Sequence, residues 1–249
     1  MGASTVFPFA RAAAAFAAYE RNARDAVRWA HPSWLEAALG AEPAELGGLR
    51  TALATAPRAH LDACSLALIE FAGVRTPPFD ALRSPNPAVL DALPAAQGQR
   101  VLRMRSLFLR RAEVRRLIDK RSRRQISEWV GLPIDQLMAI WANGAALADR
   151  SRTAPASHVL DPGRLGGPSR FPALDRVDAE LLAQEGCALM LRDARSGVAP
   201  FVLLRLALPV GLGEPAWFAD GGREVDPGGT ARVLASLPEL LPEWPWLSG

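Results

Sequence analysis

The sequence has little of what metal centres, disulfide scaffolds and membrane spans are built from. Among its 249 residues there are two cysteines and three histidines. Cys64 and Cys187 lie far apart and no CxxC pair occurs, so the chain has neither a disulfide framework nor a zinc-finger pattern. No apolar run approaches the roughly 20 residues that a membrane helix needs, because Arg205 interrupts FVLLRLALPV. These absences favour a cytoplasmic globular protein without membrane insertion, and we expect both cysteines to be buried as small apolar side chains.

Catalytic motifs are scarce as well. Lys120 is the only lysine and no glycine pattern precedes it, so the chain has no phosphate-binding P-loop. There is no GxSxG nucleophile turn, and His31, His60 and His158 form no HExxH pair. GLGEPA at 211–216 matches a dinucleotide fingerprint only superficially, because no helical pattern follows to hold a pyrophosphate. The sequence predicts a protein that is not an enzyme and needs no cofactor or metal. An active site assembled from distant residues stays an alternative.

An excess of either charge is also missing, since 29 Lys and Arg residues against 26 Asp and Glu residues leave a net charge of +3. Nearly all of the cations are arginines, which together with abundant Ala, Gly and Pro is typical of a GC-rich bacterial genome. Arginine counts alone are therefore weak evidence for phosphate binding. Three acids, Asp220, Glu224 and Asp226, lie in a glycine-rich segment without the spacing of a calcium loop, and we expect them to be solvated.

Helical patterning is what the sequence does contain. Apolar residues recur at helical spacing through most of the chain, and alternating segments are scarce. The apolar run at 201–209 is too short for periodicity to decide between strand and helix. The predicted fold is mainly α: a single irregular helical domain over 1–249, with at most a minor β contribution near 201–209 and Pro/Gly-rich loops at about 73–99 and 150–172. The expected helices cover about 10–30, 32–40 with Pro32 in the first turn after His31, 49–71 with a break at Pro57, 100–120, 123–130, 133–149, 173–195 and 230–241.

The segment RRQISEWVGLPIDQLMAIW at 123–141 has the outline of a helix-turn-helix. Gly131 accepts the left-handed conformation that ends a helix, and Pro133 suits the start of the next one. Eleven basic residues lie between Arg100 and Arg124. These features make a helix-turn-helix DNA-binding regulator the alternative function.

The second helix of this segment argues against base reading. In a helix-turn-helix, polar side chains from its first turns contact base edges. Here Asp135 repels phosphate, and four apolar residues share one face: Ile134, Leu137, Met138 and Trp141. We therefore expect a packing corner in which Trp129 and Trp141 are largely buried, and no specific nucleic-acid partner.

The helix expected at 100–120 has a cation within its apolar face. At about 100° per residue, that face holds Met104, Leu107, Phe108, Val114 and Ile118. Arg111 projects from its middle with Arg115 beside it. Such a cation extends to water, pairs with an acid of the chain, or contacts a protein partner. The candidate partner-binding residues are Arg110, Arg111, Arg115, Arg116, Arg123 and Arg124.

The order of several segments resembles a known family. AHPSWL at 30–35 precedes VLRMRSLFLRRAEVRRLIDKRSRRQISEWVG at 101–131, and EGCALMLRDA at 185–194 and RLALP at 205–209 follow. This order is similar to that of the SctK (YscK-like) proteins of bacterial type III secretion, particularly the branch found in plant pathogens. The segments 73–99 and 150–172 carry no part of the resemblance.

The resemblance implies a non-catalytic adaptor at the cytoplasmic face of the inner membrane. Members of that family join the sorting platform between the inner-membrane ring protein SctD and the C-ring protein SctQ. They lie under the export apparatus that the ATPase SctN and its stator SctL serve. The expected partners are therefore an SctQ-like and an SctD-like protein, and no contact residue is implied by the family.

Overall fold

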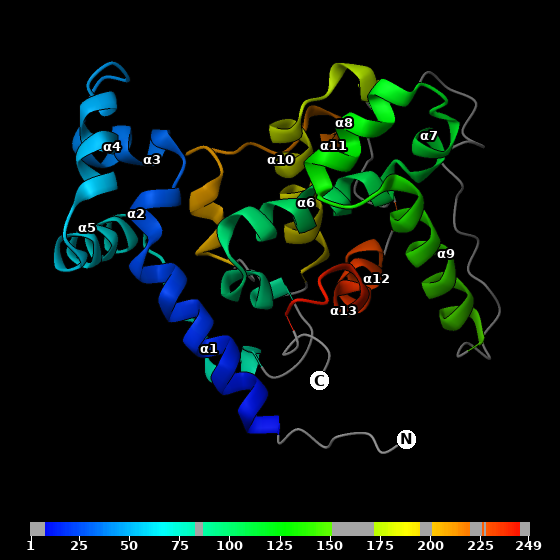
Figure 1. Ribbon diagram of the computed structural model, residues 1–249, viewed down its shortest axis with the longest axis horizontal. Coiled ribbons are helices and arrows are strands. Elements are labelled where there is room, and N and C mark those ends of the chain that lie inside the picture. The colour runs from blue at the N-terminus through cyan, green and yellow to red at the C-terminus, as the bar shows by residue number, and fades with distance from the viewer. Residues whose placement is uncertain are drawn as a thin grey trace. The chain divides into compact units, whose positions relative to one another are not determined.

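The structure is a computed structural model, and it describes residues 8–82, 87–150, 172–194, 201–219, 226 and 228–244. Within those ranges every regular element is a helix, and no strand occurs (Figure 1). The predicted mainly α fold is confirmed. The run at 201–209 takes a short 3-10 turn, η4 (Leu204–Ala207), rather than a strand. No helix of the described residues is long and apolar enough to cross a membrane.

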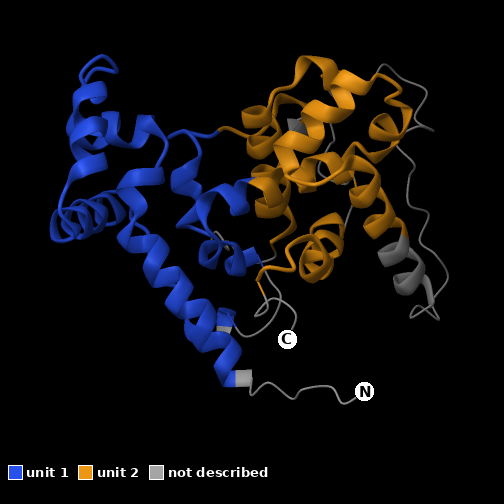
Figure 2. Cartoon of the chain, in the orientation of Figure 1, with its two compact units in different colours: residues 1–99, 198–212, 249 blue, residues 100–197, 213–248 orange. Residues whose placement is uncertain are grey.

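The chain divides into two compact units (Figure 2). Unit 1 comprises residues 1–99, 198–212 and 249, and unit 2 comprises 100–197 and 213–248. The boundary falls within one helix, α6 (Ala95–Leu109), between Gln99 and Arg100. The single domain over 1–249 stays a prediction, because a compact unit of this size is not by itself an independently folding domain.

Unit 1 is built from short helices around an alanine- and leucine-rich core. α1 contacts α5 and η2, and α2 contacts α4 and α5. The small residues Ala12, Ala15 and Ala18 are buried on α1, which lets neighbouring segments approach that helix closely. The elements are α1 (Pro8–Arg24), α2 (Ala26–Trp29), α3 (Pro32–Leu39), α4 (Leu46–Thr55), α5 (Arg58–Phe71), η1 (Phe79–Leu82), η2 (Pro87–Ala92) and η4.

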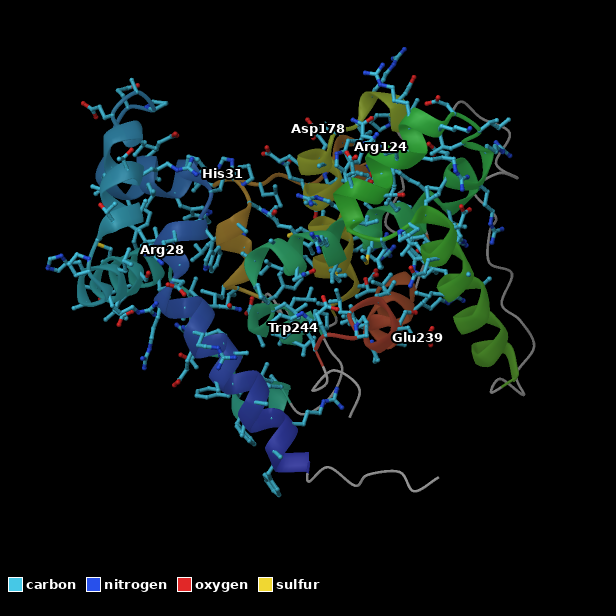
Figure 3. The ribbon with its side chains drawn as sticks, viewed as in Figure 1. Arg28, His31, Arg124, Asp178, Glu239 and Trp244 are labelled. Atoms are coloured by element: carbon cyan, nitrogen blue, oxygen red, sulfur yellow. The ribbon has the colours of Figure 1, made fainter. Side chains whose placement is uncertain are left out.

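Segment 30–35 and segment 205–209 meet in unit 1. His31, labelled in Figure 3, caps α3, because its Nδ1 accepts from the backbone N–H of Ser33. Pro32 is the first helical residue, as expected. The backbone N–H of His31 donates to Leu206 O at 2.7 Å, and the indole of Trp34 donates to Leu208 O at 2.8 Å. Two segments that carry the family resemblance therefore fix each other's position.

Asp91 organises the same region from the interior of unit 1. Its side chain is buried and accepts from the backbone N–H of Leu204 at 2.7 Å and of Val202 at 3.0 Å. Asn22 of α1 donates in turn to the backbone carbonyl of Asp91 at 3.0 Å. A single buried carboxylate thus holds η4 against η2, because it satisfies N–H groups that the short turn leaves without partners.

In unit 2, α6 and α10 are buried along most of their length. α9 contacts α8, α12 and α13, and α10 contacts α12. The two helices approach each other closely at Gly186 of α10, where an added Cβ would lie 1.8 Å from the carbonyl oxygen of Leu102 on α6. The elements are the larger part of α6, α7 (Arg111–Arg116), α8 (Lys120–Val130), α9 (Ile134–Arg150), η3 (Leu174–Arg176), α10 (Ala179–Asp193), α11 (Ala216–Ala219), α12 (Gly229–Ala235) and α13 (Leu237–Leu240).

Two element predictions are corrected. The helix expected at 100–120 is two helices, because α6 begins at Ala95 and ends at Leu109, and α7 ends at Arg116. The segment 73–99 is likewise not a continuous loop, since η1, η2 and the start of α6 lie within it. The loop expected at 150–172 falls almost entirely outside the described residues.

Cys64 and Ile118 are more exposed than predicted. Cys187 is buried as expected, but Cys64 is exposed on α5. Ile118 is 91% exposed, because the break after α7 takes it off the apolar face on which a continuous helix would have placed it. Trp141 is buried at 5% exposure, whereas Trp129 is only partly buried.

Candidate functional site

The arginines of α6 to α8 form two groups, one inside unit 2 and one on its surface. Arg105 belongs to the first, with its side chain fully buried in the middle of α6. Its guanidinium donates to Asp193 at 3.0 Å, to Asp226 at 2.9 Å, and through Nε to Thr230 at 2.9 Å. Burial would raise the pKa of Asp193, but the Thr230 hydroxyl and the Arg105 guanidinium outweigh it, and the pKa falls below its ordinary value. Asp226, expected in solvent, is instead buried beside Arg105.

Arg110, which follows α6 directly, forms a second buried cluster with Glu185. Its side chain is 1% exposed, and it contacts both oxygens of Glu185 on α10, with Nε at 2.9 Å and Nη2 at 2.8 Å. The same carboxylate accepts from the Ser106 hydroxyl and from the Trp217 indole, the latter at 3.1 Å. Such two-point geometry is the strongest pairing that arginine makes with a carboxylate. In this conformation the guanidinium of Arg110 faces the interior and not a partner.

Arg111 is intermediate between the two groups. Its side chain is 24% exposed, and it lies 5.1 Å from the centre of the Phe108 ring. It donates to the carbonyl of Phe108 at 3.0 Å and contacts Asp226 at 3.5 Å. The sequence left three roles open for Arg111: extension to water, pairing with an acid of the chain, or contact with a protein partner. The structure shows the pairing with an acid of the chain.

The surface group lies where α7 ends and α8 begins. We call Arg115, Arg116, Lys120, Arg121 and Arg124 the basic surface, and all five side chains are exposed. Arg124, labelled in Figure 3, makes a 2.9 Å pair with Glu128 four residues further along α8. Its side chain is 83% exposed, so this pair contributes little to stability.

The position of Lys120 and Arg121 is unfavourable for the helix itself. They occupy the first turn of α8, which contains no acidic residue, and the N-terminal end of a helix is the positive end of its dipole. Only the N-cap, Asp119, offsets them, by accepting from the backbone N–H groups of Arg121 and Ser122. These hydrogen bonds lower the pKa of Asp119. The two cations therefore do not contribute to stability through the helix dipole.

The α8–α9 corner has the packing role that its sequence predicts. Gly131 ends α8 at φ 72°, and Ile134, Leu137 and Trp141 are buried. Trp141 meets the Phe108 ring edge-on, with 5.1 Å between ring centres. The exposed positions in the first turns of α9 include Asp135 and Gln136, and Asp135 is paired with Arg123. A carboxylate at this place repels phosphate, so the corner is poorly suited to reading bases.

A match to a known protein family shows which family the chain belongs to. The model of the bacterial type III secretion protein family HrpB4 matches residues 6–243. The chain belongs to this family. It is the SctK-type family of plant-pathogen secretion systems, which the order of segments indicated. No curated protein and no solved structure matches the chain.

The described part of this HrpB4-family chain contains no group of three or more His, Cys, Asp and Glu residues that could hold a metal ion. A hollow of about 420 Å³ in unit 1 lies between α2, α3 and α4. Its lining is apolar except for Arg28 and Arg50, without an acid or a histidine. Among the described residues, the acid whose pKa burial raises to about 7, Asp91, lies outside this hollow and is buried between backbone N–H groups.

Sequence reasoning missed several residues of the HrpB4-family chain. Arg105 was not singled out, because its partners Asp193 and Asp226 lie 88 and 121 positions away. Ile118 is predicted on an apolar face because the expected helix runs through 117–119, and Lys120 and Arg121 are not among the candidate partner-binding residues. Asp119 followed by Ser122 is a helix-start signal that could have placed the break.

Proposed function

We propose that this HrpB4-family chain is a non-catalytic cytoplasmic adaptor of a type III secretion system. It would link an SctD-like protein of the inner-membrane ring to an SctQ-like protein of the C-ring, as part of the sorting platform. The observation that carries the proposal is the family match over 6–243, which makes the chain a type III secretion protein. The finer role within the apparatus follows from the resemblance to SctK proteins.

The distribution of charge supports a binding role. An adaptor holds its partners by surface complementarity, and charged surfaces steer a partner and fix its orientation more than they add affinity. Arg110 is used inside unit 2, and Arg111 and Arg123 are mostly covered and paired with acids. Of the six arginines proposed from the sequence, Arg115, Arg116 and Arg124 remain as exposed contact residues, and Lys120 and Arg121 join them.

The test is a direct titration of the full chain with each partner. Purified protein is titrated with the SctQ-like protein and with the cytoplasmic part of the SctD-like protein from the same bacterium. We expect Arg115→Glu with Arg116→Glu to fold normally and to weaken one of the two complexes. The loss should be larger at low salt, where electrostatic attraction is less screened.

Arg50→Glu with Arg75→Glu is the matched control, since it makes the same change in charge at two exposed arginines of unit 1. Absence of binding of the wild type to both partners would reject the adaptor role. Equal weakening by both double variants would mean that net charge, and not the basic surface, controls binding.

A further inference from the structure

Ile118 is the most exposed large apolar side chain that the structure describes, at 91%. It lies in the connection 117–119 between α7 and α8. Leu117 has extended backbone angles of φ −69° and ψ 109°, and Asp119 has φ −68° and ψ 124°. The chain therefore crosses the connection in an extended form, with Ile118 at its centre.

The two neighbours of Ile118 are both fixed by hydrogen bonds. The backbone N–H of Leu117 donates to Val114 at 3.2 Å, and its carbonyl accepts from Arg123 at 3.3 Å. The Asp119 carboxylate accepts from the backbone N–H and the hydroxyl of Ser122, each at 2.8 Å. A short connection held at both ends fixes the backbone from which its central side chain projects. Binding through Ile118 would then cost little ordering entropy.

Cations surround this side chain along the sequence. Arg115 and Arg116 precede it, and Lys120 and Arg121 follow within three positions, all of them exposed. The only acid between them, Asp119, is occupied with capping α8. An exposed apolar side chain flanked by polar residues matches the apolar centre and polar rim of protein interfaces.

We propose that Ile118 is the apolar anchor of the basic surface, and that it enters an apolar socket rimmed by acidic residues on a protein partner. This inference rests on the proposed function, since the partner is one of the two proteins that the adaptor would join. The inference adds to the proposed function that Ile118 supplies affinity for the partner, whereas the arginines supply steering and orientation.

A protein surface fits these features better than a lipid surface. Peripheral membrane binding generally uses a wide apolar face, and here a single aliphatic side chain projects among charges. The Asp119 carboxylate beside it is fully exposed and would be repelled by anionic headgroups. A protein socket can instead enclose one side chain and place its acids opposite the arginines and away from Asp119.

The test compares Ile118→Ser and Ile118→Leu with the wild type in the full chain. The probes are the purified SctQ-like protein and the cytoplasmic part of the SctD-like protein. We expect Ile118→Ser to raise the Kd for one partner about tenfold, as removal of a hot-spot side chain does. The factor should be equal at low and high salt, unlike that of the charge reversals. Ile118→Leu should bind nearly as the wild type does.

Leu39→Ser is the matched control, because that side chain is 61% exposed but belongs to α3 of unit 1. It should leave the Kd unchanged, and all three variants should keep the wild-type thermal midpoint. If the wild type binds a partner and Ile118→Ser binds it equally well, the anchor is refuted while the adaptor role stands. If the wild type binds neither partner, the adaptor role fails and the anchor with it. Sedimentation with phosphatidylglycerol vesicles that is lost in Ile118→Ser would also overturn the proposal, in favour of a lipid contact.

Discussion

The indole nitrogen of Trp34 donates a 2.8 Å hydrogen bond to the carbonyl oxygen of Leu208, 174 positions further along the chain. The two residues belong to AHPSWL and RLALP, short segments that look unrelated in the sequence. The fold places them in contact, together with the bond from the backbone N–H of Val210 to the Ser33 hydroxyl at 2.9 Å. Their joint presence in the sequence therefore has a structural cause.

Trp34→Phe should lower the stability of the protein. The substitution keeps an aromatic ring but removes the donor, which leaves the Leu208 carbonyl without this partner at a buried residue. We expect a loss of about 1–2 kcal/mol in the free energy of unfolding, measured by chemical denaturation. An unchanged denaturation midpoint would show that water replaces the indole without cost.

Gly186→Ala should destabilise the protein although alanine favours helices. The new Cβ would lie 1.8 Å from Leu102 O, a backbone atom that cannot turn aside. We expect the cost of separating α6 and α10, about 1–3 kcal/mol, to exceed the gain in helix propensity of about 1 kcal/mol.

The control for this prediction is Gly48→Ala in α4, where no atom lies within 4 Å of the new Cβ. That variant should be neutral or stabilised. Denaturation midpoints that shift in the same direction for both glycine variants would contradict the close approach of α6 and α10.

Arg110→Ala should lower stability strongly, because it leaves the Glu185 carboxylate buried without its guanidinium. Removing one partner of a buried pair costs about 3–5 kcal/mol. Arg110→Met combined with Glu185→Leu should recover only part of this loss, since the two apolar groups need no pairing but the Ser106 hydroxyl and the Trp217 indole lose this acceptor. Arg116→Ala, at an exposed position, should stay within about 0.5 kcal/mol of wild type. Similar unfolding curves for Arg110→Ala and Arg116→Ala would exclude a buried pair.

Asp91 should make stability depend on pH. Burial, only partly opposed by the N–H groups of Leu204, Leu203 and Val202, raises the pKa of its carboxyl from 3.8 to about 7. Between these two values the folded protein holds a proton that the unfolded chain has released. The stability from this group is therefore present below pH 3.8 and is lost as the pH rises to about 7.

Asp91→Asn removes this titration and provides the reference. The difference in unfolding free energy, wild type minus Asp91→Asn, should fall between about pH 4 and 7 and be constant above it. Urea denaturation of both proteins across this range measures the difference. A difference that is constant from pH 4 upward would show that the carboxyl titrates normally.

Duplex DNA should bind weakly and without sequence preference. The basic surface gives some attraction through counterion release, but the first turns of α9 present Asp135 where a base-reading side chain would be needed. Fluorescence anisotropy with specific and scrambled duplexes should give equal affinities that fall steeply with salt. A protected footprint that survives competitor DNA at physiological salt would instead support a regulator.

The sequence predicted best where its signals are local. Pro32 after His31 placed the start of α3, and Gly131 placed the end of α8 at the left-handed residue where the helix stops. The apolar stripe of α9 was confirmed for the same reason, because Ile134, Leu137 and Trp141 recur at helical spacing. These features depend on neighbours in the chain, which a sequence contains directly.

The rest depended on contacts between distant residues. Arg110 and Arg116 look alike in the sequence, and only the approach of Glu185 from α10 buries the first and leaves the second exposed. Asp226 lies in a glycine-rich segment and was predicted to be solvated, but in the fold it pairs with the buried Arg105. Ile118 was misplaced for a local reason, since the capping role of Asp119 was overlooked and the helix was extended through the break.

The exposure of Cys64 and Lys120 gives the protein two natural labelling sites with different chemistry. Lys120 is the only lysine of the chain, and it lies at the start of α8 within the basic surface. Cys64 is exposed on α5 in unit 1, while the other thiol, Cys187, is buried in unit 2. A maleimide dye should therefore report on unit 1, and an amine-reactive dye should, besides the chain's amino terminus, report on the basic surface of unit 2. A protein that approaches either unit could then be followed by the quenching of one dye, without introducing a single mutation.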